Sequence, residues 1–366
     1  MTCSRTRSPT RGRDRALIEQ VGVCATRIFG LLPVERLERQ LASAELTVVM
    51  RATAVFDASA VQWLLDNPAT MLTDDAGRAL GVAVDRAAVV EARAAIAGHG
   101  ASFESMRVSN LGKHYIRKLR RRSKMLAFSL DEMPAREAEK LLFANVYKGV
   151  TDIVTRYAWP APALLATRLA ARFHIAPNAI TIAGIALTVL AGWLFFTGNI
   201  ATGLIAAWTM TFLDTVDGKL ARVTVTSSRI GNLLDHGTDI VHPPLWWLCL
   251  AYGLALADPG SAHTIWLACW LILGAYVVGR AVEISFHLLF GFNGFLYARF
   301  DSLFRLVVAR RNIILLIMSG GVLLGAAPAA FVVCAGWSLV STLLQSIRLG
   351  QAKLASRQRR LEPWIS

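Results

Sequence analysis

The sequence offers little cysteine chemistry and no secretory signal. Its five cysteines form no C-x-x-C pair, and Cys249, Cys269 and Cys334 fall inside long apolar runs. A disulfide framework and a zinc site are therefore both unexpected. The first twenty residues are rich in Arg, Ser, Thr and Pro, but no hydrophobic segment of the secretory type follows them. We expect residues 1–20 to form a disordered basic leader.

Acidic residues are also scarce, because 25 Asp and Glu stand against 39 Lys and Arg and give a formal net charge of +14. Such a basic chain suggests a nucleic-acid binder, but 54% of the 366 residues are hydrophobic and the mean hydropathy is +0.46. The Lys and Arg residues cluster beside the apolar runs, which is typical of membrane proteins with basic cytoplasmic faces. The composition therefore predicts an integral membrane protein and no nucleic-acid partner.

The first third of the chain contains no apolar run long enough to cross a membrane. Strand and helix patterns alternate there, with strands expected at 46–50, 70–73 and 79–84 and helices at 58–66 and 86–97. This alternation predicts a small α/β cytoplasmic domain over residues 21–130.

Six apolar segments follow, and several exceed the roughly 20 residues needed to cross a bilayer. They cover 178–197, 200–222, 229–257, 263–289, 312–327 and 329–348. Two amphipathic stretches, 137–156 and 164–173, precede them and are expected to lie in the plane of the interface. The predicted fold is therefore mainly α. Juxtamembrane amphipathic helices over 131–176 precede a six-transmembrane-helix bundle over 177–350, and a basic cytoplasmic tail follows over 351–366.

The distribution of Lys and Arg orients this bundle in the membrane. The connections at 198–199, 258–262 and near Pro328 carry no Lys or Arg, whereas the segments at the other ends of the spans are basic. By the positive-inside rule, both termini are predicted on the cytoplasmic side of the cell inner membrane.

Four aspartates lie inside the second and third spans, where a buried carboxylate costs about 3 kcal/mol on insertion scales. Asp214 and Asp217 are spaced i,i+3, and Asp235 and Asp239 are spaced i,i+4, so each pair shares one face of its helix. Two antiparallel helices can point both pairs into one cavity, where all four stay ionised only around a divalent cation. Carboxylates without His or Cys at metal spacing favour Mg²⁺ or Mn²⁺, with Ca²⁺ as an alternative, over zinc.

The aspartates belong to the longer pattern D-x2-D-G-x2-A-R-x8-G-x3-D-x3-D, which is matched at every fixed position from Asp214 to Asp239. This pattern resembles the signature of the CDP-alcohol phosphotransferase family, membrane enzymes that move a phospho-alcohol from a CDP-linked donor to an acceptor hydroxyl and release CMP. The resemblance implies phospholipid or inositol-phosphate-type biosynthesis with a CDP-linked lipid or alcohol as the donor. It also implies that Asp239 is the general base as well as a metal ligand. It further implies that the protein forms a homodimer and contacts membrane lipid.

The remaining fixed positions suggest how the donor binds. We expect the four aspartates to coordinate one or two divalent ions that bind the donor pyrophosphate. Gly218 and Ala221 leave the helix backbone open to the nucleotide, and Gly231 serves nucleotide access or close helix packing. Helix packing alone is the alternative for each of these small residues. Arg222 pairs with a phosphate or takes part in a purely structural ion pair.

The remaining arginines of the helical region are candidates for binding the acceptor. Arg280 lies in the fourth span with Glu283, and an intramembrane charge is a functional candidate, although a structural pair between the two is an equal alternative. Arg305 and Arg310 are candidates for binding a phosphorylated acceptor, and with Arg299 and Arg311 they also satisfy the positive-inside rule. Arg280, Arg305 and Arg310 are thus the predicted acceptor-binding residues.

Two segments of the first half weakly resemble the bifunctional inositol-phosphate enzymes of this family. Residues 30–39 are similar to the start of a sugar-nucleotidyltransferase domain, and Lys148-Gly-Val-Thr151-Asp152 is similar to a juxtamembrane segment. No glycine-rich G-x-G-x-R loop is present to hold a triphosphate. We therefore expect residues 21–130 to be a non-catalytic remnant of such a domain, or an unrelated regulatory domain.

A run of Lys and Arg lies between His114 and Lys124. Its aromatic interleaving is thin, with Tyr115 alone nearby, which disfavours nucleic-acid binding. Anionic lipid headgroups attract such a cluster at about 1 kcal/mol per charge. We expect this run to face lipid or a phosphorylated substrate, or to be a solvated basic surface.

The alternative from a different class is a carboxylate-lined membrane cation transporter. Transporters often carry internal repeats with matching helix breaks, whereas here all four aspartates fall in two adjacent segments without a second copy. A catalytically silent scaffold is a third possibility, which the intact aspartate set disfavours.

Overall fold

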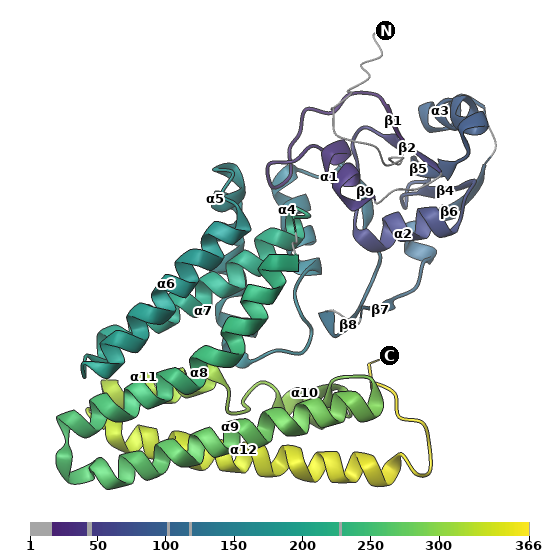
Figure 1. Ribbon diagram of the computed structural model, residues 1–366. Helices are drawn as coiled ribbons and strands as arrows, with labels where there is room; N and C mark the ends of the chain where they lie inside the picture. The colour runs from purple at the N-terminus through teal and green to yellow at the C-terminus, as the bar shows by residue number, and fades with distance from the viewer. Residues whose placement is uncertain (1–16, 42–45, 101–102, 117–118, 227–228, 366) are drawn as a thin grey trace. The chain divides into compact units, whose positions relative to one another are not determined.

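A computed structural model describes residues 17–41, 46–100, 103–116, 119–226 and 229–365, except for the side chains of His114, residues 229–236 and Asp239. The chain divides into two compact units. The first comprises Met1–Lys113 with Lys124–Leu142, and the second comprises His114–Ser123 with Phe143–Ser366. Figure 1 shows a mixed α/β first unit and a second unit of long helices.

The first unit is built on a five-stranded sheet with the order β1-β2-β5-β4-β6. Its strands are β1 (Ile18–Val21), β2 (Thr47–Arg51), β5 (Ala79–Val84), β4 (Thr70–Thr73) and β6 (Glu104–Arg107). β5 pairs antiparallel with β2 and β4, whereas the outer pairs β1–β2 and β4–β6 are parallel. A separate ribbon pairs β3 (Ala54–Phe56) with β9 (Ala127–Ser129).

Both faces of this sheet are covered by helices. Val48 and Met50 of β2 belong to the hydrophobic cluster that includes residues of α1 (Pro33–Gln40) and α2 (Ala58–Asp66). Val49 belongs instead to the cluster that includes Ala92 and Ile96 of α3 (Val89–Ala97). Since successive side chains of a strand point to opposite faces, alternate residues of β2 fill two cores. The predicted small α/β region is confirmed.

Several sequence-based boundaries in this unit need correction. β1 begins at Ile18, inside the segment 1–20 that was predicted to be a leader. The helix predicted over 86–97 begins as a 3₁₀ turn, Arg86–Ala88, before α3. β6 was not predicted because its residues, Glu104–Arg107, are mostly exposed and lack the alternation of a half-buried strand.

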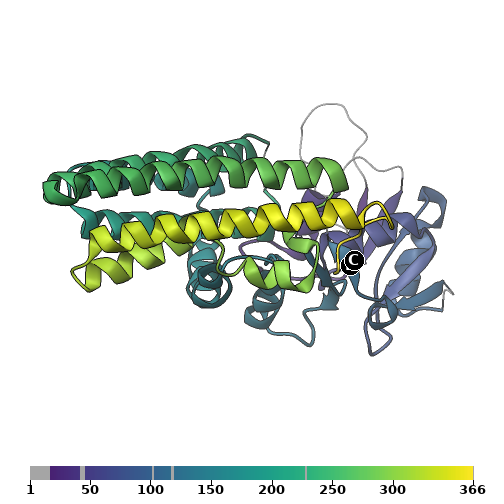
Figure 2. The same cartoon turned by 90° about the horizontal axis from the view of Figure 1, so that it is seen from below.

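The second unit is dominated by helices at the six predicted positions: α6 (Pro177–Phe196), α7 (Ile200–Val223), α8 (Arg229–Ala257), α9 (Ala262–Phe290), α11 (Arg311–Leu323) and α12 (Ala327–Ala355). Shorter elements are α4 (Ala135–Asn145), which begins in the first unit, a π-helical turn at Val154–Ala158, α5 (Pro160–Arg172), the 3₁₀ turns Pro259–Ser261 and Gly294–Leu296, and α10 (Arg299–Phe304). In both views α9 and α12 run side by side, in agreement with their contacts (Figure 1, Figure 2).

Four segments of the described chain are long and apolar enough to cross a membrane: Pro177–Phe196, Ile240–Ala257, Pro259–Phe290 and Ala327–Ala355. α11 is apolar but shorter. α7 carries Asp214, Asp217, Lys219 and Arg222 in its last ten residues, which lowers its apolar character. The structure therefore supports a mostly helical membrane protein, and the count of six spans stays a prediction.

The continuous helix predicted over 137–156 is wrong. α4 ends at Asn145, and helical structure resumes only with the π-helical turn at Val154–Ala158. Gly149 lies in the gap, where its N–H donates to Leu119 O over 2.8 Å. A Cβ at Gly149 would lie 2.6 Å from Arg121 Cβ and 2.7 Å from Arg120 O. The chain thus leaves the helix to pack against the segment at 119–121, which sequence periodicity cannot show.

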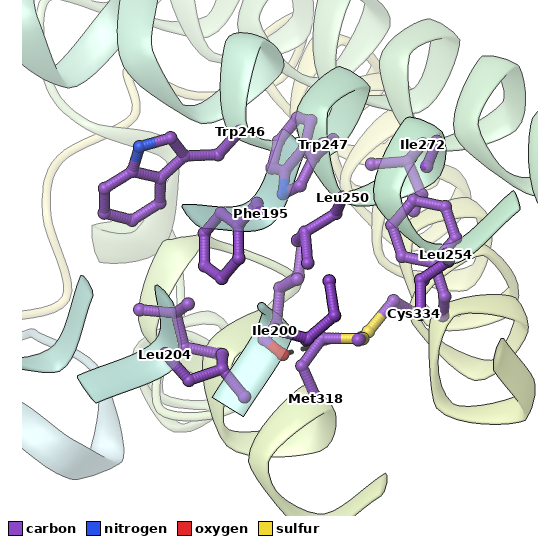
Figure 3. Packing of buried hydrophobic residues seen from close by; sticks show 14 of the residues in the cluster. Phe195, Ile200, Leu204, Trp246, Trp247, Leu250, Leu254, Ile272, Met318 and Cys334 are labelled. Carbon is purple, nitrogen blue, oxygen red and sulfur yellow. Dashed lines mark hydrogen bonds between the residues drawn. The ribbon is translucent and has the colours of Figure 1, made fainter. Parts of the chain in front are cut away.

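The core of the helical unit joins α6, α7, α8, α9, α11 and α12 (Figure 3). The rings of Phe195 and Trp246 meet edge to face with centroids 5.9 Å apart. Trp246 Nε1 also donates to Thr188 O over 2.9 Å. A Cβ at Gly253 would lie only 1.9 Å from Phe195 O, so this glycine permits the close approach of α8 to the end of α6. These contacts fix α8 against α6.

Candidate functional site

The polar end of α7 carries the first aspartate pair. Asp217 is 7% exposed, and its Oδ2 accepts a hydrogen bond from Thr181 Oγ1 over 2.7 Å. Thr181 stands one turn inside α6, the helix that begins with Pro177. The start of α6 therefore supplies a donor to a carboxylate that burial would otherwise penalise. The sequence pattern identified Asp217, but it did not indicate that Thr181 is the hydrogen-bond partner of this carboxylate.

Asp214 lies one turn earlier on α7 and is half-buried. Arg311 Nη2, at the first position of α11, donates to Asp214 Oδ2 over 2.6 Å. Arg311 Nη1 also lies 3.4 Å from Nε2 of His242 on α8. Because His242 Nδ1 lies 2.6 Å from Thr238 O, which can only accept, Nδ1 carries the proton and Nε2 accepts from Arg311. Arg311 of α11 thus connects the carboxylate of Asp214 on α7 to His242 on α8.

The second aspartate pair is placed by its backbone alone. Asp235 and Asp239 belong to α8, as does Gly231, and the side chains of all three lie outside the described residues. His242 follows Asp235 and Asp239 at i+7 and i+3, so the three positions share one face of the helix. This spacing is the signal that could have singled out His242.

The donor set suits a hard cation. In the part of the chain that the structure describes, no group of three or more His, Cys, Asp or Glu that could hold a metal ion is found. The two described aspartates supply oxygen ligands only, and the two further carboxylates of the pattern fall on the neighbouring helix. Such a set fits Mg²⁺ or Mn²⁺ and does not fit zinc.

The small residues of the pattern were predicted to face the nucleotide, and in this structure Gly218 and Ala221 lie next to Arg222. A Cβ at Gly218 would lie 3.2 Å from Arg222 Nη2, so the open backbone there accommodates the helix's own arginine. Ala221 is half-buried beside Arg222 on α7. The roles of Gly218, Ala221, Arg222 and Gly231 in nucleotide binding stay predictions.

Lys219 is the most buried cation of α7, with 3% of its surface exposed. Its Nζ lies 3.3 Å from the centroid of the Tyr147 ring and donates to Val146 O over 3.4 Å. A cation above an aromatic face is stabilised by the quadrupole of the ring. Lys219 therefore ties α7 to the segment after α4.

Two of the three predicted acceptor residues, Arg280 and Arg310, contact one half-buried carboxylate. Glu283 Oε1 accepts from Arg280 Nη2 over 3.0 Å and forms a second, short ion pair with Arg310. The guanidinium groups of Arg305 and Arg310 stand over the ring of Phe295, with CZ 5.6 Å and 5.4 Å from its centroid. The structural pair considered for Arg280 and Glu283 is thus present. It belongs to a larger cluster of arginines.

Arg280, Glu283 and Arg310 line a pocket between α9 and α12, and Arg305 is not among the residues that line it. The polar lining of the pocket comprises Tyr276, Arg280, Glu283, Arg310, Ser338, Thr342 and Gln345. Among the described residues, Arg305 Nε and Nη1, Arg310 Nε and Gln345 Oε1 are buried without a hydrogen-bond partner. Burial lowers the pKa of Arg305 to about 9. Buried donors without acceptors point to an anionic ligand.

Asp152 lies near Arg305 of this cluster and forms several hydrogen bonds there. Its Oδ1 accepts from Asn312 Nδ2 over 3.0 Å and from Thr155 N over 3.0 Å. Although burial acts to raise it, nearby Arg305 and these hydrogen bonds hold the pKa of Asp152 below its ordinary value. The juxtamembrane segment is thereby anchored to the start of α11.

Comparison with known families agrees with the aspartate pattern. Residues 174–340 match the model of the CDP-alcohol phosphatidyltransferase family. The matched region comprises 167 of the 366 residues. It begins just before α6, extends into α12 and contains all four aspartates. The resemblance inferred from the pattern is confirmed, and the transporter alternative gains no support.

Two curated relatives of the family domain are synthases. The archaetidylinositol phosphate synthase of Pyrococcus horikoshii is 43% identical over 109 residues, which are 30% of this chain and 54% of that protein. The phosphatidylinositol phosphate synthase of Mycobacteroides abscessus is 33% identical over 89 residues, which are 22% of this chain and 40% of that protein. The chain thus spans about half the length of the curated relatives that it matches.

Solved structures of the Mycobacterium tuberculosis phosphatidylinositol phosphate synthase PgsA1 are also similar. The structure with CDP-DAG bound covers 51% of this chain and 92% of its own, at 18% identity and a TM-score of 0.40. The complex with manganese and citrate covers 51% of this chain and 88% of its own, at 18% identity and a TM-score of 0.41.

Proposed function

We propose that this protein transfers a phosphatidyl-type phospho-alcohol group from a CDP-linked donor to an acceptor hydroxyl and releases CMP. The acceptor oxygen forms a bond to the donor phosphorus that bears the alcohol, the bond from that phosphorus to CMP breaks, and the acceptor loses its proton to a base. The observation that carries this proposal is the complete aspartate pattern on α7 and α8 within the matched family domain. The products would be phospholipids or inositol-phosphate conjugates.

The four aspartates would hold one or two Mg²⁺ or Mn²⁺ ions. Asp214 and Asp217 offer carboxylates from one face of α7, and Asp235 and Asp239 occupy one face of α8. When bound, the metal neutralises charge on the donor pyrophosphate and on the departing CMP. Asp239 would accept the proton of the acceptor hydroxyl. The tight partners of Asp214 and Asp217 hold these two carboxylates in fixed positions.

The nucleotide would lie along the open backbone of α7 at Gly218 and Ala221, near Gly231 of α8. Arg222, whose guanidinium lies against Gly218, would contact a donor phosphate. The acceptor would bind in the pocket that Arg280 and Arg310 line, with Arg305 as a further predicted contact. Three guanidinium groups around Glu283 favour an acceptor that carries a phosphate.

We further propose residence in the cell inner membrane, with both termini cytoplasmic and the chain paired as a homodimer. The four apolar segments support membrane insertion. The first unit would be a non-catalytic relative of a nucleotidyltransferase domain or a regulatory domain. Its mixed five-stranded sheet with helices on both faces accommodates both interpretations.

Release of labelled CMP from CDP-diacylglycerol tests the proposal directly. The purified full chain in nanodiscs is assayed against a panel of free and phosphorylated polyols, with Mg²⁺, Mn²⁺ or EDTA. We expect metal-dependent release that Asp214→Asn lowers about a hundredfold or more. Asp258→Asn, which alters a half-buried aspartate outside the pattern, is the matched control. No release with any donor and acceptor, together with cation flux into liposomes, would favour the transporter alternative.

A further inference from the structure

The chain turns back after α12 and packs against the helical unit. In Figure 1 the yellow end of the ribbon leaves α12 and reverses its direction. Leu361 and Ile365 pack against an aromatic cluster that includes Phe295 and Phe304. The segment 361–365 was predicted as part of a basic cytoplasmic tail, and in this structure it is a packed part of the helical unit.

Trp364 makes the specific contacts of this segment. Its backbone N–H donates to Leu296 O over 3.0 Å, and its Nε1 donates to Ser302 Oγ over 2.9 Å. Ser302 Oγ donates in turn to Phe295 O over 2.7 Å. The hydroxyl of Ser302 therefore acts as acceptor and donor at once. Trp364 is thus linked to two successive carbonyl groups, to one directly and to the other through Ser302.

These two carbonyl groups belong to the segment that supports two predicted acceptor residues. Phe295 lies in the 3₁₀ turn Gly294–Leu296, which precedes α10. The guanidinium groups of Arg305 and Arg310 lie over its ring, with CZ 5.6 Å and 5.4 Å from the centroid. Among the described side chains, Arg305 Nε and Nη1 and Arg310 Nε are buried without a hydrogen-bond partner. Because a cation is attracted to the face of an aromatic ring, the position of Phe295 affects where these donors point.

The same turn lines a pocket that adjoins the predicted acceptor pocket. Phe295 and Phe304 line this second pocket together with Glu283 and Gln345. Glu283 and Gln345 also line the pocket to which Arg310 belongs. A displacement of Phe295 would therefore change the surroundings of Glu283, the carboxylate that Arg310 binds.

α10 has an attachment to α12 that does not involve Trp364. Arg348 donates from Nε to Asp301 Oδ1 over 2.7 Å and from Nη2 to Asp301 Oδ2 over 2.6 Å. Asp301 is 4% exposed, and a bidentate pair of this kind fixes geometry as well as charge. Loss of the Trp364 contacts should therefore move the turn that carries Phe295 while α10 stays folded on α12.

We propose that Trp364 is a positioning residue of the acceptor site. Its hydrogen bonds fix the turn that carries Phe295. The ring of Phe295 in turn sets where Arg305 and Arg310 present their donors to an anionic acceptor. This inference rests on the proposed function for the identity of the acceptor, a phosphorylated alcohol. Trp364 lies outside the matched region 174–340, so the aspartate pattern gives no indication of it.

Phosphate binding and steady-state kinetics of the full chain in phosphatidylcholine nanodiscs test the inference. Inorganic phosphate is titrated, and the rise in unfolding temperature gives the half-saturating concentration. CMP release gives kcat and separate KM values for CDP-diacylglycerol and for the best phosphorylated polyol of the panel. Trp364→Ala is expected to raise the half-saturating phosphate concentration and the acceptor KM about tenfold, and to change kcat and the donor KM by less than about twofold. Glu362→Gln, an exposed side chain of the same segment, is the control.

A second pair of variants tests the route through Ser302. Trp364→Phe keeps an aromatic ring but lacks the indole N–H, and it should raise the same two quantities about threefold. In a Ser302→Ala background, Trp364→Phe should have no further effect, because the acceptor of the indole N–H is already lost. Additive effects of the two substitutions would show that Trp364 does not act through Ser302.

The outcomes separate this inference from the proposed function. Equal phosphate binding by wild type and Trp364→Ala, including none by either, overturns the inference, whether or not CMP is released. A lower unfolding temperature with unchanged phosphate binding and acceptor KM also overturns it, because Trp364 would then only stabilise the fold. Equal increases in the donor KM and the acceptor KM contradict a role specific to the acceptor. Phosphate binding that depends on Trp364 without any CMP release supports the positioning role and rejects the transfer reaction.

Discussion

Arg311 and Asp214 form an ion pair of 2.6 Å between the start of α11 and the polar end of α7. The arginine is also held by His242, whose protonated Nδ1 faces the carbonyl of Thr238. A guanidinium is therefore bound to a carboxylate that is proposed to bind a metal ion. The positive charge of Arg311 opposes the binding of a cation at Asp214, since like charges at short range repel.

Removing this charge should alter metal affinity. We expect Arg311→Gln to bind Mn²⁺ about three- to tenfold more tightly than wild type, because one repulsive charge is lost. Electron paramagnetic resonance of free Mn²⁺ measures this without turnover. Arg299→Gln, an exposed arginine on α10, serves as the control and should leave the affinity unchanged. Weaker binding by Arg311→Gln would mean that the arginine orients Asp214 for the metal.

The hydrogen bond from Thr181 to Asp217 predicts a second effect. Thr181→Val keeps the shape of the side chain but removes the donor from a carboxylate that is 7% exposed. We expect the rate of CMP release to fall about tenfold, because Asp217 loses its orienting partner. Thr188→Val, on the same helix, removes a hydroxyl that donates to Gly184 O among the described residues, and it should have little effect. Equal rates for both variants would rule out a positioning role for Thr181.

The aspartate pattern was accessible from sequence because its spacing is local. Residues at i,i+3 and i,i+4 share a helix face whatever the rest of the fold does. The apolar runs likewise predicted α6 and α7 to within about one residue at each end. In the first unit, β4 and β5 were predicted with their observed bounds. These features depend on short stretches of sequence that carry one clear period.

The partners of the site could not be predicted, since they depend on packing between distant segments. The pair Asp214–Arg311 joins positions 97 residues apart, and His242–Arg311 joins positions 69 apart. The basic run at 114–124 was interpreted by composition alone, which cannot show that Arg121 binds Ala144 and Asn145. The same contacts explain why the helix predicted over 137–156 ends early.

Two glycines of the membrane helices should respond oppositely to alanine. A Cβ at Gly253 would lie 1.9 Å from the carbonyl oxygen of Phe195, so Gly253→Ala forces α8 away from α6 and should destabilise the protein by about 1–3 kcal/mol. Gly274 of α9 has no atom within 4 Å of such a Cβ. Gly274→Ala should raise stability by up to about 1 kcal/mol through helix propensity. Thermal unfolding in detergent measures both, and a loss of stability in Gly274→Ala would contradict the prediction.

Asp152 should make stability depend on pH in the acid range. Its folded pKa is held below the ordinary value, so its contribution is present above the unfolded pKa of about 4 and is lost as the pH falls through the folded pKa. Asp152→Asn keeps the shape but carries no charge beside Arg305. The unfolding temperature of this variant should therefore lie below wild type at neutral pH, and the difference should shrink as the pH falls below about 4. Asp66→Asn, which alters an aspartate hydrogen-bonded only to Gln62 in the described structure, is the control. A difference that stays constant down to about pH 3 would show that Asp152 acts through its hydrogen bonds to Asn312 and Thr155 and not through its charge.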